Sequence, residues 1–368
     1  MGARLVARVV VVLALGLPAT TRASDDVDDA PDAPVVVGYE GGLYAQDPAG
    51  RWRARLRINL QPRLFATTVD EAGNEALVAA FVLRRARVTL SGSALLPALS
   101  FRLQTAFDLG VVQLTDAWVQ YALVDDLLSL RAGRWKRPFS RPFIGSSFEL
   151  EFVDLPITER AFDAGRDLGV ALGNDYEQSP PLEYVIGVFN GDEVPVEVAL
   201  PFRPAVVGRL GVNLGGIDGY EEADFEGGPL RLAVAASGRL DLDLDGSGDG
   251  RVLAEVDGVA KAYGGSMSAG LYLELAQQGA GALALAPSQV GARVQGGYVY
   301  LGTLEPALRY AVVAPVGGVR RHEGVAAFSV YFVEHAFKWQ SDFSLLVFED
   351  AGAVTTGARA RTQLTFSF

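Results

Sequence analysis

The sequence predicts an all-β protein, a transmembrane antiparallel β-barrel of about 16 strands. Three observations predict it. After residue 50, polar and apolar residues alternate with a period of two in repeated segments of roughly ten residues, which is typical of barrel strands. Beyond the N-terminus, no stretch is long and apolar enough for a membrane-spanning helix. The chain ends on an aromatic residue that closes an amphipathic segment, Phe368, and this is the usual signal for the outer-membrane barrel-assembly machinery.

The N-terminus predicts export. Residues 1–23 carry Arg4 and Arg8, then an apolar run and then small residues, which is the layout of a cleavable secretory signal peptide. A single membrane anchor is less favoured, because the apolar run is shorter than the ~20 residues that span a bilayer. Residues 24–49 begin with an Asp-rich stretch and are expected to form a periplasmic N-terminal segment before the barrel at 50–368.

The composition excludes several classes of function. The chain of 368 residues has no cysteine, which excludes a disulfide framework, thiolate chemistry and cysteine-ligated metal sites. Its formal net charge is −12, whereas a nucleic-acid-binding protein would carry a basic surface. The sequence shows no phosphate-binding glycine loop of the P-loop type. We therefore expect no cofactor, no metal and no nucleic acid as a partner.

Sixteen segments are expected to be strands of the barrel. The first, RWRARLRINLQPRLF at 51–65, puts its arginines on one face and its large apolar residues on the other, whereas a helix would scatter both around its circumference. The later segments repeat this alternation between clusters of Gly, Asp, Asn and Pro. The expected strands are 50–66, 80–92, 97–108, 112–122, 127–137, 166–174, 182–191, 203–214, 229–240, 251–262, 265–277, 291–302, 305–314, 323–333, 336–348 and 357–368.

The connections between these segments agree with a barrel topology. If the N-terminus is periplasmic, the odd connections are extracellular loops and the even ones are short periplasmic turns. Most of the even connections are short, although the one at 215–228 is unusually long. The third extracellular connection, 138–165, is the longest. We expect it to fold inward and narrow a channel.

The arginine face of the early strands is expected to line the barrel interior. A basic side chain that faces lipid costs roughly 2 to 4 kcal/mol at the bilayer midplane, so consecutive arginines must point into the lumen. A soluble secreted β-sheet binding protein would explain the alternation equally well, but not the terminal Phe368. The expected lumen-facing residues are Arg51, Arg53, Arg55, Arg57, Arg63, Arg85, Arg87, Arg102 and Arg131.

These arginines predict an electropositive wall. From Arg51 to Arg141 there are 14 Arg or Lys and 7 Asp or Glu, in a chain whose net charge is −12. Arginine stays charged at any working pH and holds an oxyanion through its planar fork, so such a wall would concentrate anions and repel cations. The alternative is that the arginines pair with Asp108, Asp116 and glutamates across the lumen and only satisfy a polar interior.

Residues 131–172 resemble the phosphate- and pyrophosphate-selective porin O/P family of Gram-negative outer membranes. Members show a strand ending in G-[RQ]-[FW]-K-x-P-F, a Ser-containing stretch, and then E-R and R-D-L-G-V elements. The segments 81–92 and 114–121 also resemble family elements. The matching residues are Gly133, Arg134, Trp135, Lys136, Pro138, Phe139, Glu159, Arg160, Arg166, Asp167, Leu168, Gly169 and Val170.

The resemblance implies a sixteen-stranded, trimeric barrel whose eyelet and arginine ladder conduct anions. This chain departs from the family in its loop, where Glu149, Glu151, Asp154 and Glu159 bring in acid and argue for mild rather than strict phosphate preference. The residues carried over as eyelet or entrance positions are Arg134, Lys136, Arg137, Arg141, Arg160 and Arg166.

Two other interpretations carry less weight. The segment DLDLDGSGDG at 241–250 resembles a calcium loop, but the position of the bidentate Glu falls on Val252 or Val256. This favours an exposed hairpin loop, with weak divalent-ion binding as the alternative. An outer-membrane barrel enzyme is disfavoured because His322 and His335 have no companion motif for metal binding or nucleophilic catalysis.

The sequence therefore predicts a porin of the bacterial outer membrane, through which small solutes diffuse passively. We expect a preference for anions, with phosphate-like oxyanions as the class that the family resemblance implies. The expected partners are these solutes, outer-membrane lipid and lipopolysaccharide, the barrel-assembly machinery through Phe368, and further copies of the chain in a homotrimer.

Overall fold

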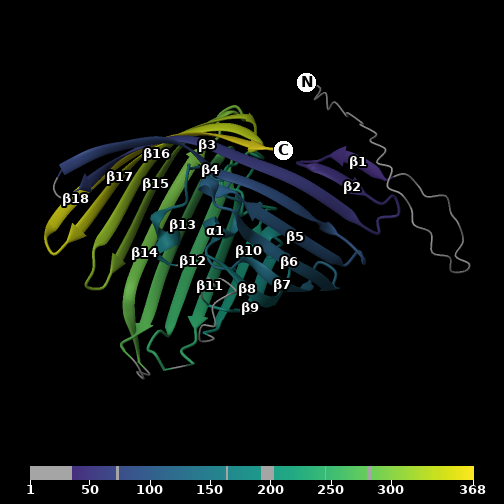
Figure 1. Cartoon of the computed structure of the whole chain (residues 1–368), viewed down its shortest axis with the longest axis horizontal. Helices are drawn as coiled ribbons and strands as arrows, with labels where there is room; N and C mark the ends of the chain where they lie inside the picture. The colour runs from purple at the N-terminus through teal and green to yellow at the C-terminus, as the bar shows by residue number, and fades with distance from the viewer. Residues whose placement is uncertain (1–34, 72–73, 163–164, 192–202, 245, 280–283) are drawn as a thin grey trace, which may run out of the picture.

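The strands form one closed antiparallel barrel (Figure 1). This computed structural model describes residues 35–71, 74–162, 165–191, 203–244, 246–279 and 284–368. Within them, sixteen strands, β3 to β18, pair in chain order, and β18 closes the barrel by pairing with β3 from Thr67 to Asn59. No described helix has the length and apolar character needed to cross a membrane. The expected signal peptide at 1–23 lies outside the described residues.

The elements are as follows. The strands are β1 (Val36–Tyr39), β2 (Leu43–Gln46), β3 (Arg53–Glu71), β4 (Asn74–Ser93), β5 (Leu99–Ala106), β6 (Gln113–Val124), β7 (Leu128–Lys136), β8 (Arg166–Gly173), β9 (Leu182–Phe189), β10 (Ala205–Leu214), β11 (Arg231–Asp241), β12 (Arg251–Ala262), β13 (Gly265–Gln277), β14 (Leu285–Tyr298), β15 (Leu304–Pro315), β16 (Arg320–Val333), β17 (Phe337–Asp350) and β18 (Ala353–Ser367). The helical turns are η1 (Asp108–Gly110), α1 (Arg141–Ile144), α2 (Ile157–Ala161) and η2 (Tyr176–Gln178).

The barrel wall separates an apolar outer face from a polar inner face. In β10, Leu210 and Val212 point outward and are 59% and 46% exposed, whereas Arg209 and Asn213 point inward and are almost fully buried. The same alternation runs through β11 and β17. An apolar belt outside and polar side chains inside are what a barrel in lipid requires. The sixteen-strand barrel predicted from the alternation is confirmed.

Two features of the N-terminal region differ from the sequence prediction. Residues within 24–49 form a hairpin of β1 and β2, and β2 pairs with Arg53–Leu56 of β3. In Figure 1 this purple hairpin lies beyond the barrel wall, near the C-terminus. Strands β3 and β4 are also longer than predicted, because their pairing continues to Glu71 and Asn74. The hairpin was missed because each of its strands has only four residues.

The long connection between β7 and β8 lies inside the barrel, as predicted. We call residues 137–165 the inner loop. Its Phe139, Phe152 and Phe162 are each at most 1% exposed, and Phe139 and Phe162 belong to the largest apolar cluster, which fills part of the lumen. Its Asp154 accepts hydrogen bonds from Arg63 and Arg85, which holds the loop against β3 and β4.

A second connection also enters the lumen. Residues 215–230, here called the strap, join β10 to β11 at the barrel end that carries Phe368, whereas the inner loop enters from the opposite end. Ile217, Ala223 and Asp224 of the strap are at most 2% exposed. The length of this connection was visible in the sequence, but nothing in the alternation indicated that it folds inward.

Candidate functional site: a charged cavity against one wall of the barrel

Two adjoining cavities lie inside the barrel. The larger, of about 260 Å³, takes all of its barrel-wall residues from β3 to β8. The smaller, of about 150 Å³, extends toward the Phe368 end, where Gly41, His335 and Ser367 line it. The residues that line both are Arg57, Arg102, Gln104, Ser146, Phe148 and Glu149.

The opposite half of the lumen is filled by paired polar side chains. Arg209 of β10 lies 3.0 Å from a carboxylate oxygen of Glu183 and 2.7 Å from one of Asp257. Farther round the wall, Lys338 and Gln340 of β17 donate to the carbonyl oxygen of Leu150 in the inner loop. Because buried polar groups need such partners, these networks fix the inner loop against β9 to β18, and the larger cavity lies on the other side, beside β3 to β8.

Three of the five cationic side chains that line the larger cavity already have partners. Arg166 lies 2.7 Å from a carboxylate oxygen of Asp116, and Arg87 lies 3.0 Å from one of Asp108. The Nζ of Lys136 donates to the carbonyl oxygens of Ile144 and Gly145. These cations hold the wall and the inner loop together as well as contributing positive charge to the cavity.

Arg57 and Arg102 are different, because neither forms an ion pair within the described part of the chain. Arg57 donates only to the backbone oxygen of Gly41, at 2.7 Å, and the buried Nε of Arg102 has no hydrogen-bond partner. Arg57 lies on β3 and Arg102 on β5, and β4 runs between these two strands. Their neighbours in register on β4 are the small residues Thr89 and Ser91. Both line both cavities, so their guanidinium groups are available to an anion.

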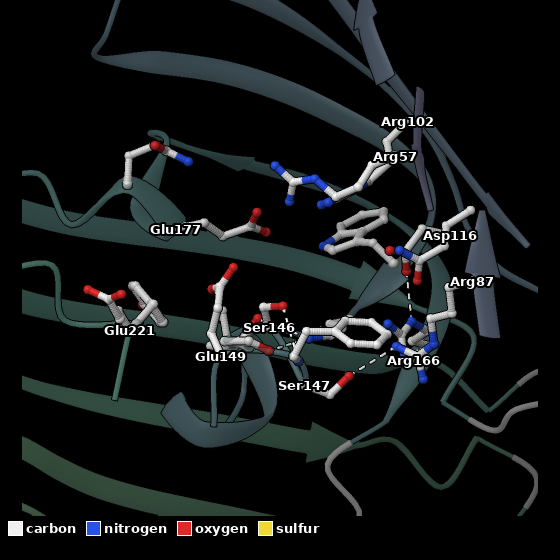
Figure 2. Close-up of a pocket in the computed structure, with 18 of the residues that line it drawn as sticks. Arg57, Arg87, Arg102, Asp116, Ser146, Ser147, Glu149, Arg166, Glu177 and Glu221 are labelled. Carbon is white, nitrogen blue, oxygen red and sulfur yellow. Dashed lines mark hydrogen bonds and ion pairs between the residues drawn. The ribbon is translucent and has the colours of Figure 1, made fainter. Parts of the chain in front are cut away.

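Acidic side chains lie on the other side of the larger cavity. Figure 2 shows Glu149, Glu177 and Glu221 opposite the arginines. Burial raises the pKa of Glu149. Burial also raises the pKa of Glu221 to about 7, against the opposing effect of Lys261. With Asp218 and with Asp116, which is paired with Arg166 on the arginine side, the lining contains five carboxylates and five cations.

The architecture was compared with those of known proteins. No family model matches the sequence, and no curated protein sequence matches it. Among solved structures, the chain is similar to an anion-selective porin from Comamonas acidovorans, at 12% identity over 86% of this chain and 100% of that chain, with a TM-score of 0.60. It is also similar to the outer-membrane channel DcaP of Acinetobacter baumannii, at 13% identity over 88% and 99%, with a TM-score of 0.62. Salmonella typhi OmpF gives 14% identity over 90% and 100%, with a TM-score of 0.56.

The fold is that of an outer-membrane porin. At these sequence identities, the similarity shows the fold but does not indicate which solute passes through the pore. The resemblance to the phosphate-selective porin O/P family therefore still depends on the motifs in 131–172 alone. A porin barrel belongs in the outer membrane, in agreement with the apolar outer belt described above.

The structure places five of the predicted site residues on the cavity of this porin fold: Arg57, Arg87, Arg102, Lys136 and Arg166. It places three others outside the lumen. Arg51 is exposed and pairs with Asp47, and Arg53 and Arg55 pair with Glu40 in the turn of the β1–β2 hairpin. Strand β2 pairs with Arg53–Leu56 of β3, so this part of the chain faces the β1–β2 hairpin and not the lumen.

Five more predicted residues are buried in the lumen but line neither cavity. Arg63 and Arg85 bind Asp154, and Arg131 lies 2.7 Å from an oxygen of Glu177 and over the ring of Trp118. Arg137 contacts Asp167 and the backbone of Gly191. Arg141 pairs with Asp257 and anchors the start of the inner loop.

The last two predicted residues face other surroundings. Arg134 is in register with Ala117 and Leu168, and Leu168 is 47% exposed on the outer face of the barrel, so Arg134 also points outward. Arg160, in α2, is exposed and lines neither cavity.

Sequence reasoning missed the acidic lining residues outside the inner loop. Glu177 lies in the turn between β8 and β9, and Asp218 and Glu221 lie in the strap. The available signal was the acidic run IDGYEEADFE in a connection too long for a simple turn.

The two histidines have different surroundings. His322 contacts the hydroxyl of Tyr310 on β15, while His335 lies in the turn after β16, 3.0 Å from the Nζ of Lys338. Burial and the nearby charges of Lys338 and Lys261 lower the pKa of His335. No group of three or more potential metal ligands occurs among the described residues.

Proposed function

We propose that this chain is an outer-membrane porin through which small hydrophilic solutes diffuse passively, with a preference for anions. The observation that carries the proposal is the pair of guanidinium groups, Arg57 and Arg102, which line both cavities and form no ion pair among the described residues. The fold supports the channel, and these two side chains support the charge preference.

The passage follows the β3–β8 wall. With the Phe368 end taken as periplasmic, a solute enters the larger cavity, passes Arg57 and Arg102, and leaves through the smaller cavity beside Ser367. The two guanidinium groups replace part of the hydration of an anion. The facing carboxylates keep that binding weak, and conduction requires binding weak enough for the solute to leave.

Oxyanions of the phosphate type are the anion class that we propose for this passage. A guanidinium group offers a planar fork of N–H donors that matches two oxygens of such an anion. The five carboxylates that share the lining make the preference modest, and the pore also passes chloride and neutral solutes.

Conductance in planar lipid bilayers tests this function. We expect the purified protein to form open channels whose reversal potential under a KCl gradient indicates that chloride permeates more readily than potassium. Millimolar phosphate should reduce the chloride current. A reversal potential on the cation side would contradict the anion preference, and the absence of any channel activity would contradict the porin function itself.

A further inference from the structure

The strap has the features of a separate structural unit within the lumen. Its ten residues 217–226 lie between two glycine pairs, Gly215–Gly216 and Gly227–Gly228. All four glycines have positive φ angles, of 76°, 73°, 63° and 77°. Glycine adopts this conformation without the penalty that other residues carry. The chain therefore turns sharply into the lumen at one pair and out again at the other.

Three residues of the strap, Ile217, Asp224 and Phe225, fix it to the barrel wall. Asp224 binds Arg231 at the start of β11 and accepts a hydrogen bond from the backbone of Gly264. Ile217 packs in an apolar cluster with residues of β11 and β12. Phe225 lies edge-on to the ring of Tyr331, with the ring centroids 4.7 Å apart. The strap is thus held from β11 round to β16.

The strap meets the inner loop inside the lumen. Arg141 of the inner loop donates to the carbonyl oxygen of Gly219, at 3.2 Å. The backbone N–H of Glu151 donates to a carboxylate oxygen of Glu222, at 2.7 Å. Two segments that enter from opposite ends of the barrel therefore support each other, and together they line the side of the larger cavity that faces β3 to β8.

The strap presents acid to the remaining cavity. Asp218, Tyr220 and Glu221 all line the larger cavity. Of the carboxylates in that lining, the barrel wall supplies only Asp116, which is already paired with Arg166. The strap therefore supplies much of the negative charge that faces Arg57 and Arg102, and Figure 2 shows Glu221 on the side away from these arginines.

We propose that the strap is a second constriction element of the pore, and that its Asp218 and Glu221 set how strongly the passage favours anions over cations. This inference rests on the proposed porin function and deepens it. The inner loop narrows the lumen from one end, and the strap narrows it from the Phe368 end. The arginines attract anions, while the two strap carboxylates limit that attraction and allow cations to share the passage.

The isosteric double variant Asp218→Asn/Glu221→Gln tests the charge role. Both changes keep the size and shape of the side chains and remove two negative charges from the cavity lining. At pH 8 and about 0.1 M KCl, we expect the anion-to-cation permeability ratio to rise about threefold or more, because partial screening still leaves charges at this range effective. Glu226→Gln is the matched control: it removes one charge from the same strap, at a side chain that is 56% exposed and does not line the cavity. It should leave the ratio unchanged.

Deletion of residues 217–226, which leaves the four glycines as the link from β10 to β11, tests the steric role. We expect the single-channel conductance to rise at least twofold. If wild type conducts but neither the double variant nor the deletion changes selectivity or conductance, the inference about the strap is overturned and the porin function stands. If wild type is closed and the deletion variant conducts, the strap is confirmed as a constriction, but the proposed passive porin function of wild type fails. If neither conducts, the proposed porin function fails.

Discussion

The double variant Arg57→Gln/Arg102→Gln examines the charge preference of the pore most fully. It removes the two cations that line both cavities without an ion-pair partner in the described chain. The substitution should leave the barrel intact, because the side chain of Arg57 donates its hydrogen bond to the backbone of Gly41 in the hairpin turn and not to the barrel wall.

The size of the effect follows from the cavity dimensions. A sphere with the volume of the larger cavity, 260 Å³, has a radius of about 4 Å. With a contact distance of about 3 Å between ion and donor atom added to this radius, an ion at the centre lies about 7 Å from each guanidinium group. At that distance a unit charge changes the energy of an ion by about 0.6 kcal/mol in water, with opposite sign for anions and cations. Salt at about 0.1 M has a Debye length of about 10 Å and roughly halves this energy. Loss of both charges then shifts the difference between anion and cation by about 1 kcal/mol, which is a five- to tenfold change in permeability ratio.

The assay is the reversal potential of reconstituted channels under a KCl gradient at pH 7. We expect the double variant to lose the anion preference or to become cation-selective. Arg160→Gln is the matched control, since it removes an exposed arginine that lines neither cavity. The reasoning is refuted if the double variant folds and conducts with the selectivity of wild type, or if Arg160→Gln has an equal effect.

Three further predictions concern the inner loop, the acidic lining and the wall. Asp154→Asn removes the carboxylate shared by four arginines of β3, β4 and β18, and should destabilise the folded barrel by about 3 kcal/mol, measured by thermal denaturation in detergent. Burial alone would raise the pKa of Asp154, but these arginines hold it well below its usual range. The stability that these ion pairs contribute is fully present above the pKa of an unfolded Asp, about 4. It is lost only as the pH falls through the lower pKa of Asp154 in the folded barrel. Between pH 7 and 5, wild-type thermal stability should therefore not fall from this cause. Because the pKa of Glu221 is about 7, acidification from pH 8 to 6 should neutralise this carboxylate and increase the anion-to-cation permeability ratio, and Glu221→Gln should weaken that pH dependence. Gly133→Ala would place a Cβ 2.2 Å from the carbonyl oxygen of Ala117 at a φ of +130°, so the yield of folded, heat-modifiable barrel should drop sharply on electrophoresis.

The barrel could be predicted because a period-two pattern in lipid has few structural solutions. Alternation identifies the face of each residue, and closure follows because an open edge cannot remain unpaired in a bilayer. The inner loop was predictable from its length between two strong strands. Alternation does not indicate how far neighbouring strands extend. Arg53 and Arg55 lie on the same face as Arg57, but β2 pairs with Arg53–Leu56, and the first two arginines bind Glu40 in the hairpin turn and do not line the cavity.

The charge of the site was less predictable than its position. The local excess of basic residues between Arg51 and Arg141 indicated an electropositive wall. The cavity lining is instead balanced, because Glu149, Glu177 and Glu221 come from three separate connections. Which of these segments fold into the lumen is decided by tertiary contacts such as the hydrogen bond from Glu151 to Glu222. Those contacts leave no periodic signal in the sequence.

A pair of single-cysteine variants tests the central claim most directly, namely that solutes pass along the β3–β8 wall while the rest of the lumen is filled. The chain has no native cysteine, so any labelling reports on the introduced residue. Ser146 lines both cavities, whereas the inward-facing Ser344 of β17 is fully buried and lines neither. We predict that a charged thiol reagent blocks the current through Ser146→Cys channels and leaves Ser344→Cys channels unaffected. Block at Ser344→Cys without block at Ser146→Cys would contradict this path through the barrel.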